Sequence, residues 1–414
     1  MPEPSPDSVR LQRAATLAAH VAFVPTGIVT VLLGPLLPSL SARWGLTDTQ
    51  AGDLFTAQFA ASTVGVFLSG VLVPRLGYRL AIVLGVAWMG FGVGLLPLTA
   101  WPLGLGAVAV WGLGLGVCIP ACNLLVAEVH PQRSGAALSL LNFTWSAGAV
   151  ACPILLAPFE HRGAVFFYLE LLAGALLVIA VSLAALPLPL AHGRKASPAR
   201  ATPARSSSVG FLEIFATPLA LVIAALFFLY TGVENSVGGW VASYAKRIAT
   251  GGGMLWVAAP SFFYFALLIG RGVAAPVLRR VSELRLARIG LGIAVSGIVA
   301  LLASNSIAGV LVSASVTGLG LAAVYPITIA IMTRTVGRSS PGISSMMFAL
   351  AGLGAACVPW LVGFESTQQA SLKAGLGVAL GACVVMLGLY LQRWPAVASA
   401  PSAESPQQPA NLVN

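Results

Sequence analysis

The sequence consists largely of apolar runs of about 20 residues that alternate with short polar segments. An α-helix rises about 1.5 Å per residue, so a run of this length crosses a hydrocarbon layer of about 30 Å. Charged residues make up only 8% of the 414 residues, too few to cover the surface of a water-soluble protein of this size. Because lipid cannot hydrogen-bond to the backbone, each run is predicted to be a membrane-spanning helix. We expect twelve spans, at about residues 14–39, 51–73, 79–98, 104–127, 134–157, 164–187, 215–242, 255–277, 286–303, 307–332, 342–363 and 372–392.

The spans form two groups of six, separated by a segment rich in Ala, Ser and Pro at residues 188–214. Its basic residues are accompanied by no acid before Glu213, and this composition is typical of a solvated, flexible linker. We therefore predict two six-helix bundles, at residues 14–187 and 215–392, a cytoplasmic tail at residues 1–13 and a disordered tail at residues 393–414. The first apolar run is too long for the core of a cleavable signal peptide, so we interpret it as a span.

The basic residues predict the orientation, because Lys and Arg accumulate in cytoplasmic loops. With the N-terminus inside, 16 of the 22 Lys and Arg fall in cytoplasmic segments and 5 in outer loops, while Arg271 lies within the eighth span. We expect a multi-pass protein of a cell membrane, such as a bacterial inner membrane, with both termini cytoplasmic and with lipid as its surrounding partner. The bases lie between spans rather than in one stripe with aromatic residues, so nucleic acid is not an expected partner despite the net charge of +10.

The second group of spans repeats the first. Phe23 and Thr26 in the first span recur as Phe228 and Thr231 in the seventh, at an offset of 205. A nearly constant offset across several helices indicates a parallel internal repeat, and such repeats place a solute site near the midplane between the halves. Five further positions recur at an offset of 206: Gly112, Gly114, Pro120, Gly148 and Pro153 match Gly318, Gly320, Pro326, Gly354 and Pro359.

The loop after the second span carries a recognisable signature. Its sequence, Gly70-Val-Leu-Val-Pro74-Arg75-Leu-Gly77-Tyr78-Arg79, resembles the cytoplasmic motif of the major facilitator superfamily, although Pro74 stands where that family usually has Asp. The resemblance covers nearly the whole chain. It implies an all-α membrane protein of twelve transmembrane helices, built as two six-helix bundles related by a parallel repeat, that carries a small solute by alternating access.

Within the superfamily, three stretches are similar to the fucose-proton symporter and hexose permease group. They are Asn123–Glu128 continuing to Leu141–Ala149, Tyr230–Trp240, and Gly270-Arg271. The likeness implies a secondary active transporter for a sugar or sugar-like metabolite, with a proton as the coupling ion. The first span has no acid and the fourth has only Glu128, so the acids of proton-coupled members have no match there. An exporter of amphipathic compounds or drugs is the alternative.

Glu234 is the strongest candidate for a functional residue. It is the only acid deep within a span, and 12 residues separate it from Lys246, which places it about 18 Å below the outer surface. A charge in a span is costly and usually faces a cavity or a partner. Tyr230 precedes it by one helical turn and shares its face. Glu234 is predicted to bind a solute hydroxyl or to take up a proton; the alternative is a structural ion pair with Arg271.

Amide and aromatic side chains within the spans complete the predicted site. Sugars need amide groups for their hydroxyls and an aromatic face for their C–H side. In membrane helices, however, Asn also bonds across helices and Trp anchors at the interface, which is our expectation for Trp240. Asn142 and Trp145 share a helical face and form the best pair. The further candidates are Asn123, Asn235, Gln58, Tyr264 and Tyr325.

Charged residues near the cytoplasmic ends of the helices are predicted to form an inner gate. Arg75 or Arg79 would pair with Glu128 when the protein opens outward, and separate from it when the protein opens inward. The alternative is that these side chains reach toward lipid phosphates. Arg133 and Arg271 complete this predicted cytoplasmic gate.

Several other functions are not expected. The five cysteines lie in apolar runs without metal-ligand spacing, so we predict inert thiols, no metal and no cofactor. Gly112-Leu-Gly114-Leu-Gly116 follows no strand and is not a nucleotide loop, so ATP is not expected to drive transport. No grouping of His, Asp or Cys has catalytic spacing, and we predict a monomer that is not an enzyme.

Overall fold

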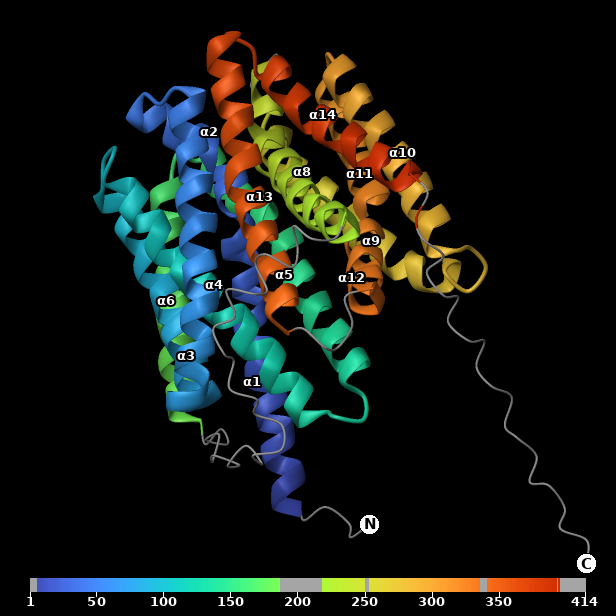
Figure 1. The fold of residues 1–414 in the computed structure, drawn as a ribbon. Helices are drawn as coiled ribbons and strands as arrows, with labels where there is room; N and C mark the ends of the chain where they lie inside the picture. The colour runs from blue at the N-terminus through green and yellow to red at the C-terminus, as the bar shows by residue number, and fades with distance from the viewer. Residues whose placement is uncertain (1–5, 187–217, 250–252, 336–340, 393, 395–414) are drawn as a thin grey trace, which may run out of the picture.

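The computed structural model describes residues 6–186, 218–249, 253–335, 341–392 and 394, and within these residues the chain is helical and has no strand (Figure 1). The first half comprises α1 (Pro6–Val31), α2 (Leu33–Trp44), α3 (Asp48–Leu95), the short 3₁₀ helix η1 (Leu96–Leu98), α4 (Gly104–Val129), α5 (Ser134–His161) and α6 (Val165–Ala185). The second half comprises α8 (Pro218–Ile248), the 3₁₀ helix η2 (Leu255–Ala258), α9 (Ala259–Val277), α10 (Glu283–Ala303), α11 (Ile307–Leu321), α12 (Val324–Thr335), α13 (Pro341–Gln368) and α14 (Leu372–Leu391).

Eleven helical stretches of the described residues are long and apolar enough to cross a membrane. One of them, Asp48–Leu98, has 51 residues and would be about 77 Å long if it were straight, more than twice the thickness of the hydrocarbon layer. It therefore holds two spans, and the chain turns at Gly77, whose φ of 80° and ψ of 165° lie outside the helical region. The predicted twelve-helix membrane fold is confirmed.

The ends of the spans differ in places from those expected. Residues 6–13 continue α1, although the sequence predicts a polar tail there. The first span is divided at Leu32 into α1 and α2, and the tenth is divided between α11 and α12. The predicted linker and the predicted C-terminal tail, except for Trp394, lie outside the described residues.

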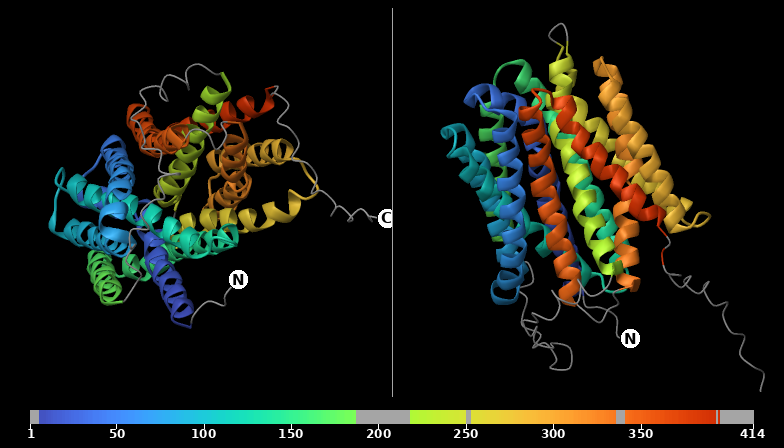
Figure 2. Two further views of the ribbon diagram at one scale, coloured as in Figure 1. Left: turned by 60° about the horizontal axis from the view of Figure 1, so that its bottom comes forward. Right: turned by 45° about the horizontal axis from the view of Figure 1, so that its top comes forward.

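The internal repeat is visible in how the helices pack. Any side chain at Gly148 on α5 would overlap the carbonyl oxygen of Val24 on α1, and any side chain at Gly354 on α13 would overlap the carbonyl oxygen of Phe228 on α8. These two close contacts are equivalent in the two halves, because they join the fifth span of each half to its first. In Figure 2 the helices α1 to α6, coloured blue to green, lie beside the yellow-to-red helices α8 to α14.

The outside of the bundle is apolar, as a lipid-facing surface must be. Large apolar side chains such as Phe67, Val178 and Val181 are exposed there. Trp240, expected at the membrane interface, is instead only 1% exposed and donates its indole N–H to the carbonyl oxygen of Pro359, 3.0 Å away. That prediction is wrong, because the indole fills a gap between the two halves rather than meeting lipid.

Candidate functional site

Glu234 lies near the middle of α8, 14 residues before its end at Ile248, which is about 21 Å along the helix axis. Its carboxylate oxygen Oε1 is 3.6 Å from Nη2 of Arg271 on the neighbouring helix α9. This ion pair is longer than a normal hydrogen bond of about 2.7–3.2 Å. Both side chains remain partly accessible, with 13% of Glu234 and 28% of Arg271 exposed. The sequence assigned Arg271 to a gate, whereas its guanidinium lies beside Glu234.

Aromatic rings surround this ion pair. Tyr230, one turn before Glu234 on α8, is 1% exposed, and its ring stacks on Tyr325 of α12 with centroids 5.1 Å apart and planes inclined by 28°. Phe227, one turn farther back, meets the Tyr325 ring edge-on at 5.5 Å. Three rings thus form one apolar wall next to two charged groups.

Several polar atoms near the ion pair have no hydrogen-bond partner among the described residues. They include the buried hydroxyl of Tyr230 and Nε of Arg271. Buried polar groups in proteins are nearly always hydrogen-bonded, since an unpaired one costs roughly 1–3 kcal/mol. Donors left open beside an accessible ion pair are therefore suited to a solute or to water.

In the first half, two predicted site residues converge on Thr30 of α1. Gln58 of α3 is fully buried and donates through Nε2 to the carbonyl oxygen of Thr30 at 2.8 Å, while its Oε1 has no partner in the described part of the chain. Trp145 of α5 lies 3.4 Å from the Thr30 hydroxyl through its indole nitrogen. These contacts fix Gln58 and Trp145 to α1.

The three predicted asparagines behave alike. Asn123, Asn142 and Asn235 each donate Nδ2 to the carbonyl oxygen four residues earlier on their own helix, at 2.8 Å. Because each bond stays within one helix, it does not support the alternative that these asparagines hold two helices together. Asn142 is exposed, and the other two are half-buried.

Close packing brings the two groups of residues to the same level of the bundle. Phe55 of α3 stacks against Trp240 of α8 at 5.8 Å, and a Cβ at Gly239 would contact the Phe55 ring. Gln58 follows Phe55 by about one turn and Asn235 precedes Gly239 by about one turn, and the two helices run in opposite directions. Gln58 and Asn235 therefore both lie about one turn from the contact of Phe55 with Gly239, on the side away from the distal ends of α3 and α8. Tyr264, in contrast, is 5% exposed and its hydroxyl lies against Gly238, so it packs on α8.

The residues of the predicted cytoplasmic gate form no ion pair with one another in the described part of the chain. Arg75, Arg133 and Glu128 are exposed and Arg79 is half-buried. Glu128 accepts a hydrogen bond from the hydroxyl of Tyr78 at 2.7 Å, and within the described residues no arginine pairs with it. Tyr78 was not among the predicted gate residues, although it stands in the signature loop itself.

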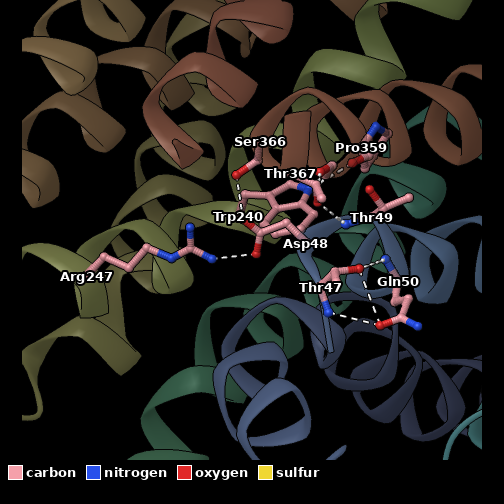
Figure 3. Close-up of polar contacts among 10 residues, drawn as sticks. Thr47, Asp48, Thr49, Gln50, Trp240, Arg247, Pro359, Ser366 and Thr367 are labelled. Carbon is pink, nitrogen blue, oxygen red and sulfur yellow. Dashed lines mark hydrogen bonds and ion pairs between the residues drawn. The ribbon is translucent and has the colours of Figure 1, made fainter. Parts of the chain in front are cut away.

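The two halves instead meet at the end of the bundle opposite the start of α1, here called the distal face (Figure 1). Asp48, the first residue of α3, binds Arg247 of α8 through Oδ1 at 2.5 Å and accepts a hydrogen bond from Ser366 of α13 through Oδ2 (Figure 3). Beside it, the backbone N–H of Thr49 donates to Thr367 at 2.9 Å. Asp48 therefore connects one helix of the first half to two of the second.

A second ion pair reinforces the distal face. Lys246, next to Arg247 in the last turn of α8, lies 3.8 Å from Glu160 of α5, whose two oxygens accept from Ser39 at 2.8 and 2.7 Å. The two bases come from the second half and the two acids from the first. We name Asp48–Arg247 and Glu160–Lys246 the distal clamp.

Contacts between the halves continue inward from the distal clamp. Trp360 of α13 donates to Asp53 of α3 at 2.9 Å, and Thr56 donates to the carbonyl oxygen of Ala356 at 3.0 Å. Sequence reasoning missed Asp48, Asp53, Glu160 and the bases opposite them, although acids at the start of a span and two adjacent bases at the end of another were visible signals.

Comparison with known proteins assigns the chain. The family model described as Major Facilitator Superfamily matches residues 19–304, more than half of the sequence. The chain belongs to the major facilitator superfamily. It is therefore a multi-pass membrane transporter and not an enzyme, as predicted.

Individual relatives show which transporters the chain is similar to. It is 22% identical to the glucose/mannose transporter GlcP of Bacillus subtilis, over 92% of this chain and 94% of that one. It is 26% identical to the cis,cis-muconate transport protein of Acinetobacter baylyi, over 96% of each. Among solved structures, the E. coli fucose:proton symporter FucP superposes with a TM-score of 0.60 at 17% identity, covering 91% of this chain and 97% of FucP. The predicted likeness to the fucose-proton symporter group is confirmed.

Proposed function

We propose that this transporter moves a sugar or sugar-like metabolite by alternating access, in cotransport with protons. The observation that carries the proposal is the half-open ion pair of Glu234 and Arg271 in the middle of α8 and α9, next to an unpartnered phenol and an aromatic wall. Ring hydroxyls suit the open donors and acceptors, and the C–H face of a sugar suits the rings. The sugar transporter among the relatives supports the same class of solute.

The cytoplasmic location of both termini completes the proposal. With the termini inside, the distal face is the outer face, and the distal clamp is the outer gate in its closed state. Glu128 separated from Arg75 and Arg79 fits an inner gate in its open state, as the inner-gate hypothesis requires of an inward-facing arrangement. Asn142 and Trp145 then belong to the first-half side of the solute path.

The test is Glu234→Gln in the full chain reconstituted in liposomes, with D-glucose, L-fucose and D-glucuronate as labelled probes. Uptake driven by a pH gradient is compared with exchange at equal pH on both sides. Loss of driven uptake with exchange retained identifies Glu234 as the proton site, because Gln keeps the shape but cannot release a proton. Loss of both together with binding identifies it as a solute ligand.

The control is Glu170→Gln, which removes an acid on the exposed face of α6, away from the site. It should leave both assays unchanged. Glu234→Gln behaving like this control would remove Glu234 from the mechanism, and failure of every probe to be transported by the wild type would overturn the proposed solute class.

A further inference from the structure

Arg271 has a hydrogen-bond donor in this site for which no described residue is an acceptor. Among the described residues, its ion-pair partner Glu234 is 3.6 Å away and its Nε has no hydrogen-bond partner. A guanidinium carries five N–H donors and keeps its charge under all physiological conditions. Holding it inside a span without acceptors is costly, so its donors are available to a ligand that reaches it.

The ligand chemistry follows from the excess of donors. The hydroxyl of Tyr230 lies within interaction distance of Arg271. Among the described residues, the acid paired with Arg271 is Glu234, at a distance longer than a normal hydrogen bond. A second carboxylate binds a guanidinium through two parallel N–H···O bonds, which a neutral sugar hydroxyl cannot reproduce. The aromatic part of this site includes the half-buried ring of Tyr325, which stacks on Tyr230.

We propose that the preferred solute is a sugar acid, whose carboxylate binds Arg271 in competition with Glu234. This inference rests on the proposed function and narrows its solute class. When Glu234 is ionised, it already balances the charge of Arg271. Adding an anionic solute would then leave a net negative charge in a poorly solvated site. When Glu234 takes up a proton, Arg271 is free for the solute carboxylate. One anion and one proton thus bind together, and the site gains no net charge.

Other titratable groups near Glu234 do not compete for this role. Tyr230 on α8, Tyr264 on α9 and Tyr325 on α12 lie within electrostatic reach of the Glu234 carboxylate, as does Arg271. Phenols are neutral near pH 7 and arginine stays charged, so none of these groups can replace Glu234 as the proposed proton site.

The test uses three probes that separate carboxylate recognition from hydroxyl recognition. D-glucuronate has hydroxyls and a carboxylate, D-glucose has hydroxyls only, and benzoate has a carboxylate only. Calorimetry on the purified full chain at pH 8, in buffers of different ionisation enthalpy, measures affinity and proton uptake. We expect D-glucuronate to bind at least about tenfold more tightly than D-glucose, with about one proton taken up per molecule bound.

Two variants assign these effects to residues. Arg271→Gln should abolish the preference for D-glucuronate over D-glucose, whereas Arg279→Gln, an exposed arginine beyond the end of α9, should leave that preference as in the wild type. Glu234→Gln should keep D-glucuronate binding but take up no proton. If Arg271→Gln does not fold, the proton uptake and probe preference of the wild type decide alone.

The outcomes separate this inference from the proposed function. D-glucose binding as tightly as D-glucuronate, or D-glucuronate binding without proton uptake, overturns the sugar-acid inference and leaves a neutral-sugar transporter standing. Unchanged D-glucuronate affinity in a folded Arg271→Gln also overturns it. No binding of any of the three probes overturns both.

Discussion

Many polar side chains inside this bundle hydrogen-bond within their own helix, whereas several buried polar atoms of the candidate site have no partner among the described residues. Asn123, Asn142 and Asn235 each bond one turn back, which keeps a span stable in lipid. In contrast, Gln58 Oε1 and the Tyr230 hydroxyl are buried and have no hydrogen-bond partner among the described residues. At the residue scale, the candidate site combines unpartnered polar atoms with the ion pair of Glu234 and Arg271 inside the spans.

Asn142 and Trp145 provide a prediction at this scale. Asn142→Ala removes an exposed amide that bonds only its own helix, so solute affinity should fall several-fold while the melting temperature stays within about 2 °C. Trp145→Phe removes the contact with Thr30 but keeps the ring, and should act in the same direction. The measurement is D-glucuronate and D-glucose binding with thermal unfolding of the same samples. An equal loss of stability in both variants would instead indicate a packing role.

Single residues could be selected from the sequence where charge and surroundings disagree. Glu234 and Arg271 were found because each is charged within an apolar run. The sequence offered their pairing only as an alternative, since the distance of 3.6 Å between them depends on how α8 packs against α9. Trp240 was misassigned because an indole suits a lipid interface and a gap between helices equally well, and only the contact with Phe55 distinguishes them.

At the scale of elements, α3 is the informative helix, because it holds two spans and supplies Asp48, Asp53 and Gln58. Its turn depends on Gly77, whose positive φ and extended ψ are adopted almost only by glycine. The glycines of the signature loop are therefore not equivalent. Gly70, on the same helix, has helical geometry and open space around it.

This difference predicts opposite effects of the same substitution. Gly77→Ala should destabilise the protein by about 1–3 kcal/mol, because alanine is strained in this conformation. Gly70→Ala should be neutral or slightly stabilising, since alanine favours a helix. Thermal unfolding in detergent checks both. A Gly77→Ala variant as stable as Gly70→Ala would mean that the turn does not require this conformation.

The number and type of the elements were predictable because the length of an apolar run is set by the bilayer. The ends of the helices were less predictable, since hydropathy indicates neither the helical residues 6–13 of α1 nor the division of the tenth span. The contacts at the distal face were not predicted at all. Two of them join Asp48 to residues about 200 and 320 positions away, Arg247 and Ser366.

At the scale of the whole molecule, the halves are held together at the distal face, and the account requires them to part there when the other side closes. The distal clamp is suited to a reversible contact. Arg247 is 48% exposed, and an exposed ion pair contributes at most about 1 kcal/mol, or about fivefold in an equilibrium. Such a contact biases one state without locking it.

The most direct test is the accessibility of position 56, where Thr56 donates across the halves to Ala356 beneath the clamp. Thr56→Cys is placed in a chain whose native cysteines are replaced, and cells are labelled from outside with a membrane-impermeant maleimide. We predict slow labelling with the clamp intact and labelling up to about fivefold faster in Asp48→Asn or Arg247→Gln. The exchanged pair, Asp48→Arg with Arg247→Asp, should return it to the slow rate. Lys373→Gln, which removes an exposed base outside the clamp, should change nothing. Rates that are equal with the clamp intact, broken and exchanged would contradict alternating access through the distal face.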